Sequence, residues 1–158
     1  MRYVVISIAF GVFLIILIQY AIQNSHLKNA QRDAAKYKSL FQILAQWLEA
    51  KQNDLSFKML LDQKGYSSVA IYGIHILGER LLDDLRDAGV DVLYGIDRKS
   101  GSMKENLQVY KPTENLPAVD VVIVTAVNDF DAIKQELQKK LACPIVALDD
   151  LLCELSAL

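Results

Sequence analysis

A chain of 158 residues has room for one domain of ordinary size and an additional segment, and its hydrophobic fraction of 53% is high for a soluble domain. Residues 1–66 hold 8 Lys and Arg against 4 Asp and Glu, whereas residues 67–158 hold 9 against 15. We therefore expect no nucleic acid as a partner, because phosphate binding needs a concentrated positive surface, and no metal site, because the two cysteines lack a metal-binding spacing.

The segment Val4–Ile22 is almost wholly apolar and contains no Asp, Glu, Lys or Arg. As a helix it would rise roughly 28 Å, enough to cross the hydrocarbon core of a membrane. A cleaved signal peptide is the alternative, but Arg2 alone is a weak basic n-region and no clear cleavage site follows. We predict a retained transmembrane anchor over residues 1–25, with membrane lipid as its partner.

Four basic residues follow the predicted span, whereas only Arg2 precedes it. They are Lys28, Arg32, Lys36 and Lys38. Because cytoplasmic flanks of membrane spans carry an excess of Lys and Arg, we predict a single-pass protein of the cell membrane whose C-terminal domain is cytoplasmic.

Residues 26–66 are predicted to form an amphipathic helical connector. Its apolar residues recur at spacings of three and four in one stripe, which consists of Tyr37, Leu40, Phe41, Leu44, Trp47 and Leu48. This stripe either packs on the globular domain or pairs with a second copy as a short coiled coil, so a homodimer is an open alternative. After a break near Asn53, a short helix is predicted, with Ser56 as its N-cap and Gly65 as its stop.

The stretch Val69–Asp97 predicts a strand, a turn, a helix and a second strand. The strands are Val69–Tyr72 and Val90–Ile96, and the helix between them is Ile76–Ala88. An acidic residue, Asp97, stands directly after the second strand. This order is typical of the first βαβ unit of a Rossmann-like nucleotide-binding fold.

The turn of this unit carries a modified form of the G-x-G-x-x-G dinucleotide fingerprint. Gly73 and Gly78 take its first and third places, and His75 takes the second. In one interpretation, His75 donates to a phosphate or carboxylate at the helix N-terminus. In the other, the turn keeps its fold-forming glycines without binding a cofactor, and His75 only covers it. Asp97 is placed to accept from ribose hydroxyls, and Arg98 to meet a 2′-phosphate.

Further strands are predicted over residues 107–110, 119–125 and 144–148, with a helix over Asp129–Leu141 and a terminal helix from Asp149. With right-handed crossovers, residues 67–158 then form a Rossmann-like doubly wound parallel sheet of five strands in the order 3-2-1-4-5.

The predicted cofactor-binding residues share a place in the glycine turn or at the carboxyl edge of this sheet. They are Gly73, Ile74, His75, Gly78, Asp97, Arg98, Thr125 and Ala126. The cofactor is left open between NAD(P) and a nucleotide-sugar. No catalytic residue is predicted, because the sequence shows no Ser/His/Asp or Cys/His arrangement and no Tyr–Lys pair at one-turn spacing.

Between Gly65 and Leu152 the chain reads GYSSVAIYGIHILGERLLDDL, VLYGIDRKSG, LPAVDVVIVTAVNDFDAI and CPIVALDDLL. These segments resemble the small Rossmann-like, sugar-epimerase-like domain proteins of bacterial capsule and exopolysaccharide biosynthesis. They are also similar to the nucleotide-binding N-terminal domain of bacterial sugar acetyltransferases. Relatives commonly carry Gly where this chain has His75, and the catalytic Tyr and Lys of short-chain epimerases have no counterpart here.

The resemblance implies a cytoplasmic domain that binds a nucleotide, a nucleotide-sugar or a partner protein. We expect a membrane-anchored accessory or regulatory protein, with polysaccharide-assembly proteins as partners, rather than a complete enzyme. One alternative is an NAD(P)-dependent sugar-modifying enzyme with His75 or Tyr110 as its acid/base. The other is a structural adaptor that binds no ligand and dimerises through the connector helix.

Overall fold

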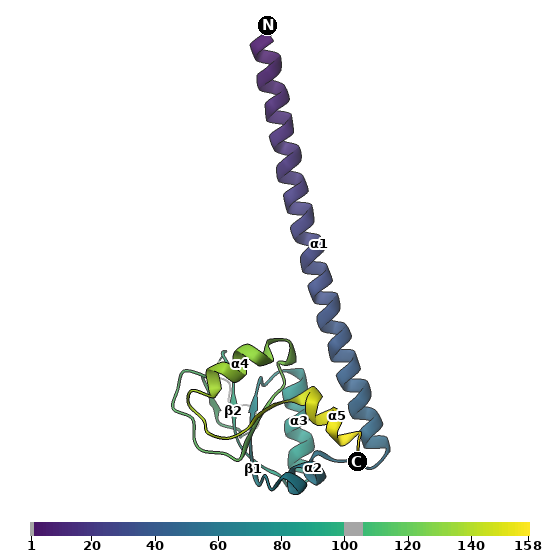
Figure 1. Ribbon diagram of the computed structural model, residues 1–158, viewed down its shortest axis with the longest axis vertical. Helices are drawn as coiled ribbons and strands as arrows, with labels where there is room; N and C mark the ends of the chain where they lie inside the picture. Colours follow the sequence, from purple (N-terminus) through teal and green to yellow (C-terminus); the bar gives the residue numbers. More distant parts are fainter. Residues whose placement is uncertain (1, 100–105) are drawn as a thin grey trace. The chain divides into compact units, whose positions relative to one another are not determined.

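The computed structural model describes the backbone of residues 2–99 and 106–158 and the side chains of residues 17–99 and 106–158. The chain forms two compact units, Met1–Gln42 and Ile43–Leu158. One helix, α1 (Arg2–Gln52), runs through the residues of the predicted anchor and most of those of the predicted connector (Figure 1). No Gly or Pro interrupts it between His26 and Lys51.

The predicted span Val4–Ile22 lies mostly outside the described side chains, which begin at Leu17. Within the part of the chain that the structure describes, no helix is long and apolar enough to cross a membrane. The transmembrane anchor therefore stays a prediction.

The last turns of α1 belong to the globular unit. Ile43, Trp47 and Ala50 are 3%, 6% and 2% exposed, at the spacing of one helix face. The Trp47 ring meets the ring of Phe57 edge to face, with 5.1 Å between centroids. Its Nε1–H donates to Asp84 Oδ2 over 3.0 Å. Of the predicted apolar stripe, Trp47 thus packs within the globular unit.

The predicted break and short helix are confirmed. Helix α2 (Phe57–Lys64) follows Ser56, whose hydroxyl accepts from the Met59 N–H at 3.4 Å. It ends at Gly65, which has φ +72° and so takes the left-handed conformation common after a helix.

The sheet of the globular unit has the predicted topology. Its strands are β1 (Ser68–Tyr72), β2 (Asp91–Ile96), β3 (Val109–Tyr110), β4 (Val121–Val124) and β5 (Ile145–Ala147). All pairings are parallel, in the order β3-β2-β1-β4-β5. Tyr72 lies opposite both Ile96 and Val124, so the carboxyl ends of β1, β2 and β4 are level.

Helices cover both faces of this sheet (Figure 1). Ala70 and Tyr72 of β1 share a buried cluster with Ile133 and Leu137 of α4 (Phe130–Leu137). Because side chains alternate along a strand, Val69 and Ile71 face the other side. That side is covered by α3 (Ile76–Asp87) and α5 (Leu148–Leu155).

Helix α4 is shorter than the predicted helix Asp129–Leu141. Residues Val127–Asp129 form a 3₁₀ turn before it, and α4 itself ends at Leu137. Leu141 is still only 8% exposed, because the turn that leads back to β5 keeps it in the core.

We expect Trp47→Phe to lower the free energy of unfolding of the globular unit by about 1–2 kcal/mol, because Asp84 loses an N–H donor while the ring contact with Phe57 remains. Calorimetry on the full chain in detergent would measure it. Gln46→Ala, at an exposed neighbouring position, is the control, with an expected change within about 0.5 kcal/mol. Equal stability of both variants would show that the Trp47–Asp84 bond contributes nothing.

Candidate functional site

The turn between β1 and α3 is held by close contacts between backbone atoms. A Cβ on Gly78 would lie 2.0 Å from the Gly73 carbonyl oxygen, so the first turn of α3 packs directly on the turn backbone. Gly73 itself has φ +91°, which L side chains rarely adopt. Both glycines are therefore required by packing and conformation.

Thr125 ties the end of β4 to the same turn. Its hydroxyl donates to the Gly73 carbonyl oxygen at 2.7 Å, and the Tyr72 carbonyl oxygen lies 3.1 Å away. Its backbone N–H donates to Tyr72 O over 3.0 Å. Thr125 is only 7% exposed, so it supports the turn from behind.

Asp97 connects the turn to the end of β2. One carboxylate oxygen accepts from the Ile74 N–H at 3.2 Å, and the other accepts from the Lys99 N–H at 2.8 Å. His75 Nε2 lies 3.6 Å from Asp97 Oδ2. A carboxylate has about four acceptor positions, so these two N–H bonds leave Asp97 able to accept from a bound hydroxyl.

Ile74 is a packing residue. Its side chain is 7% exposed and occupies the space over Gly95 of β2, where a Cβ would lie 2.8 Å from Ile74 Cγ1. Glycine inside a strand often marks such a close approach.

A cavity of about 250 Å³ lies at the carboxyl ends of β1, β2 and β4, and we call it the β1–β2–β4 cavity. It is lined by Tyr72, Gly73, His75, Asp97, Arg98, Lys99, Ala126, Asp129 and Ile133. Five of the eight predicted site residues are thus brought together there: Gly73, His75, Asp97, Arg98 and Ala126. The other three, Ile74, Gly78 and Thr125, pack behind the turn and are not among the lining residues.

The list of predicted site residues omitted four lining residues, Tyr72, Lys99, Asp129 and Ile133. Tyr72 could have been identified from the sequence, because it is the one side chain with a polar group in the apolar strand Val69–Tyr72. Its hydroxyl is buried without a well-formed hydrogen bond in the described part of the chain. Burial raises the pKa of Tyr72, and the Arg98 guanidinium acts in the opposite direction. Such a hydroxyl is free to donate to a ligand.

The cavity combines two carboxylates, those of Asp97 and Asp129, with the cationic side chains of Arg98 and Lys99 and the imidazole of His75. His75 and Arg98 have side chains that are 71% and 65% exposed, and Arg98 Nη2 is 3.7 Å from Glu136 Oε2. Both side chains are therefore free to turn toward a bound group. The N-terminus of α3 adds partial positive charge and backbone N–H groups. This arrangement suits a ligand with an anionic part and hydroxyl groups.

Another cavity, of about 370 Å³, lies past the ends of β4 and β5. Its charged lining residues are all acidic: Asp129, Asp131, Asp149 and Asp150. It would repel an anion, and in the described residues no group of three or more His, Cys, Asp or Glu is arranged to hold a metal ion.

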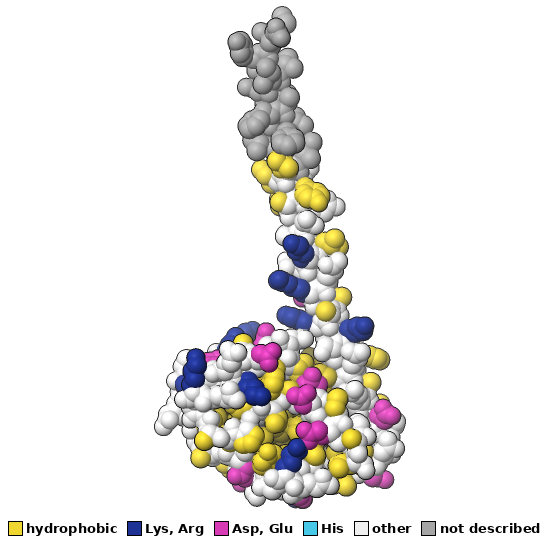
Figure 2. Space-filling model, in the orientation of Figure 1, with side chains coloured by type: hydrophobic (Ala, Val, Ile, Leu, Met, Phe, Trp, Pro, Cys, Tyr) yellow, Lys and Arg dark blue, Asp and Glu magenta, His cyan; other side chains and the backbone are white. Residues whose placement is uncertain are grey.

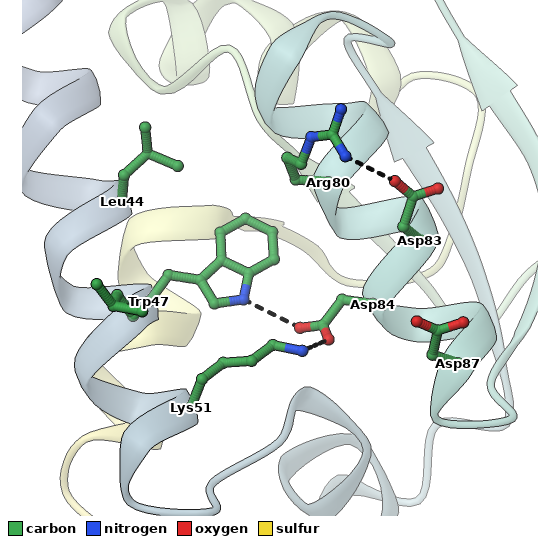
Figure 3. A pocket seen from close by; sticks show the side chains of 8 residues that line it. Leu44, Trp47, Lys51, Arg80, Asp83, Asp84 and Asp87 are labelled. Atoms are coloured by element: carbon green, nitrogen blue, oxygen red, sulfur yellow. Dashed lines mark hydrogen bonds and ion pairs between the residues drawn. The ribbon is translucent and has the colours of Figure 1, made fainter.

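A third cavity, of about 290 Å³, lies between the end of α1 and α3 (Figure 3). Trp47 and Lys51 both point toward Asp84 and bind it, and Arg80 Nη1 pairs with Asp83 Oδ2 at 3.2 Å. Because these polar groups already have partners, this cavity is a weaker candidate for a ligand.

The fold and the β1–β2–β4 cavity define a class: an open parallel α/β unit with a polar cavity at the carboxyl ends of its strands, where such sheets bind ligands. No family model, curated protein or solved structure matches this chain.

We expect Gly78→Ala to destabilise the globular unit by roughly 1–3 kcal/mol, because the new Cβ meets the Gly73 carbonyl oxygen. Helix propensity alone predicts the opposite sign, a gain of up to about 1 kcal/mol. Chemical denaturation of the full chain in detergent measures the sign of the change in the free energy of unfolding. Asp87→Ala, at an exposed position of α3, is the control and should be neutral. A stabilised Gly78→Ala variant would contradict the close contact.

Proposed function

We propose that this chain is a membrane-anchored accessory or regulatory protein whose Rossmann-like unit binds a nucleotide or a nucleotide-sugar in bacterial envelope polysaccharide biosynthesis. One observation carries the proposal: the β1–β2–β4 cavity joins the N-terminus of α3, the Asp97 carboxylate and the Arg98 guanidinium at one edge of the sheet. The resemblance of the segment Gly65–Leu152 to sugar-epimerase-like domains supports the choice of ligand class and pathway.

A nucleotide places its groups where this cavity offers partners. A phosphate fits the N-terminus of α3, whose first N–H groups have no intrahelical acceptor. The exposed side chains of His75 and Arg98 add an imidazole donor and a cationic guanidinium to it. A ribose fits beside Asp97, which has acceptor positions left.

Size favours a single nucleotide over a dinucleotide. A volume of about 250 Å³ is below the usual range for ligand pockets, roughly 300–1,000 Å³. His75 also stands where the fingerprint has the glycine that lets the pyrophosphate approach the backbone. The volume favours a nucleotide over NAD(P), whereas the position of His75 bears equally on the pyrophosphate of NAD(P) and on that of a nucleotide-sugar.

The enzymatic alternative has one observation in its favour, the 3.6 Å separation of His75 Nε2 and Asp97 Oδ2. Its other candidate acid/base, Tyr110, packs edge to face on Tyr94 with 5.2 Å between centroids and is not among the residues that line the cavity. Turnover of a UDP-sugar by the purified chain, lost in His75→Ala, would establish the enzyme and overturn the accessory role.

The membrane anchor is part of the proposal. It rests on the uncharged segment Val4–Ile22 and on the basic residues that follow it. Figure 2 shows Lys and Arg side chains on α1 after the first apolar residues whose side chains the structure describes. Such a flank favours anionic lipid at the cytoplasmic surface, on the side where cytoplasmic nucleotide-sugars are accessible.

We expect the full chain in detergent to bind UDP or a UDP-sugar in isothermal titration calorimetry. His75→Ala and Arg98→Ala should each weaken binding by about tenfold, because each removes a hydrogen-bond donor to the phosphate. Lys139→Ala is the matched control, at an exposed position that does not line the cavity. The absence of heat with UDP, UDP-sugars, NAD(H) and NADP(H) would leave protein–protein binding as the function of this unit.

We expect the full chain, expressed in a bacterium, to stay in the membrane fraction after washing with high salt and alkaline carbonate. Ile15→Lys, near the middle of the predicted span, should release a large share of it, because a charge at that depth opposes insertion. Ser25→Lys, which follows the apolar segment Val4–Ile22, is the control and should not release the protein. Wild-type protein in the soluble fraction, or intact mass showing removal of the first two dozen residues, would contradict the anchor.

A further inference from the structure

Helix α1 carries a stripe of exposed apolar residues. Tyr37 and Phe41 are each 72% exposed, and Leu48 is 60% exposed. With the exposed Leu27, Ala30, Ala34 and Leu44 they form what we call the α1 seam: Leu27, Ala30, Ala34, Tyr37, Phe41, Leu44 and Leu48. The single stripe predicted for the connector is thus divided, since Trp47 is buried and belongs to the globular unit.

The spacing of the α1 seam indicates what covers it. Its residues alternate at intervals of three and four from Leu27 to Leu48, an average of 3.5. This is the period of a left-handed coiled coil, in which each seam residue inserts between residues of a second helix. A large exposed apolar strip of this kind is uncommon on a monomer and marks an interaction site.

The charges beside the α1 seam favour a second copy in parallel orientation. If Leu27 is assigned to heptad position a, Asp33 falls at g and Lys38 at the following e position. In a parallel, in-register pair, each g residue faces the next e residue of the partner helix. Asp33 of each helix then faces the partner's Lys38, which gives two such pairs per dimer. Asp33 is the one acidic residue of the sequence between Met1 and Leu48, so this complementarity is specific.

We propose that two copies of this chain associate through the α1 seam as a parallel, in-register, two-stranded coiled coil. Identical seam residues then face each other across the two-fold axis, whereas the outer face of α1 points away from the partner helix. The inference does not depend on what the β1–β2–β4 cavity binds.

Disulfide crosslinking of the full chain in detergent tests this arrangement. Cys143 and Cys153 are first replaced by Ser, and single cysteines are then introduced by Ala30→Cys, Phe41→Cys or Leu48→Cys. All three should give a covalent dimer on mild oxidation, because facing seam positions lie within disulfide reach. Matched controls at outer positions, Arg32→Cys, Ser39→Cys and Gln46→Cys, should stay monomeric on the gel.

Each other pattern overturns the proposal. Crosslinking of Phe41→Cys without Ala30→Cys and Leu48→Cys would indicate an antiparallel or crossing contact. Equal crosslinking at seam and outer positions would indicate random collision, and none at the seam would mean that another partner covers it.

Charge reversal tests the pairing independently through the dimer dissociation constant, measured by sedimentation in detergent. Asp33→Lys and Lys38→Asp should each weaken the dimer by about fivefold or more, because two attractive pairs become repulsive. The double swap, Asp33→Lys with Lys38→Asp, should restore affinity to within about twofold. Both positions are exposed, so the globular unit is unaffected. A double swap no tighter than the single variants would overturn the parallel register.

Discussion

The structure of the β1–β2–β4 cavity depends on a contact that leaves no room for a side chain. The Gly73 carbonyl oxygen lies where a Cβ of residue 78 would be, only 2.0 Å away in the geometry of the turn. This contact sets the N-terminus of α3 directly against the end of β1. Thr125 and Asp97 then bind the same turn from β4 and β2. The helix terminus, the carboxylate and the cationic side chains share one cavity because these three strands end at the same level.

Local sequence patterns predicted most of the fold. The apolar strand Val69–Tyr72 and the caps Ser56 and Gly65 were all found as predicted. The cavity was harder to predict, because the sequence gives the edge on which a residue lies but not the direction of its side chain. Thr125 was predicted to contact a ligand, yet its hydroxyl is used by backbone carbonyls. The side chain of Ile74 is likewise used in packing over Gly95, which only the folded turn reveals.

Different faces of helix α1 are available for different contacts. Ile43 and Trp47 bury one face in the globular unit, whereas Tyr37 and Phe41 leave another face for a second helix. The sequence prediction placed Trp47 in the same stripe as Tyr37 and Phe41, because Trp47 follows Leu44 by three residues and so fits the spacing of three and four. Two chains that enter one membrane through their N-terminal segments would also run parallel, so the proposed anchor and the proposed coiled coil are geometrically consistent.

A crystal structure of the full chain grown with UDP would show whether the β1–β2–β4 cavity receives a nucleotide. We predict phosphate density at the N-terminus of α3, within hydrogen-bond distance of its first backbone N–H groups, and a ribose hydroxyl bonded to the Asp97 carboxylate. A cavity without UDP density at saturating concentration, or UDP bound elsewhere on the chain, would contradict nucleotide binding in the β1–β2–β4 cavity.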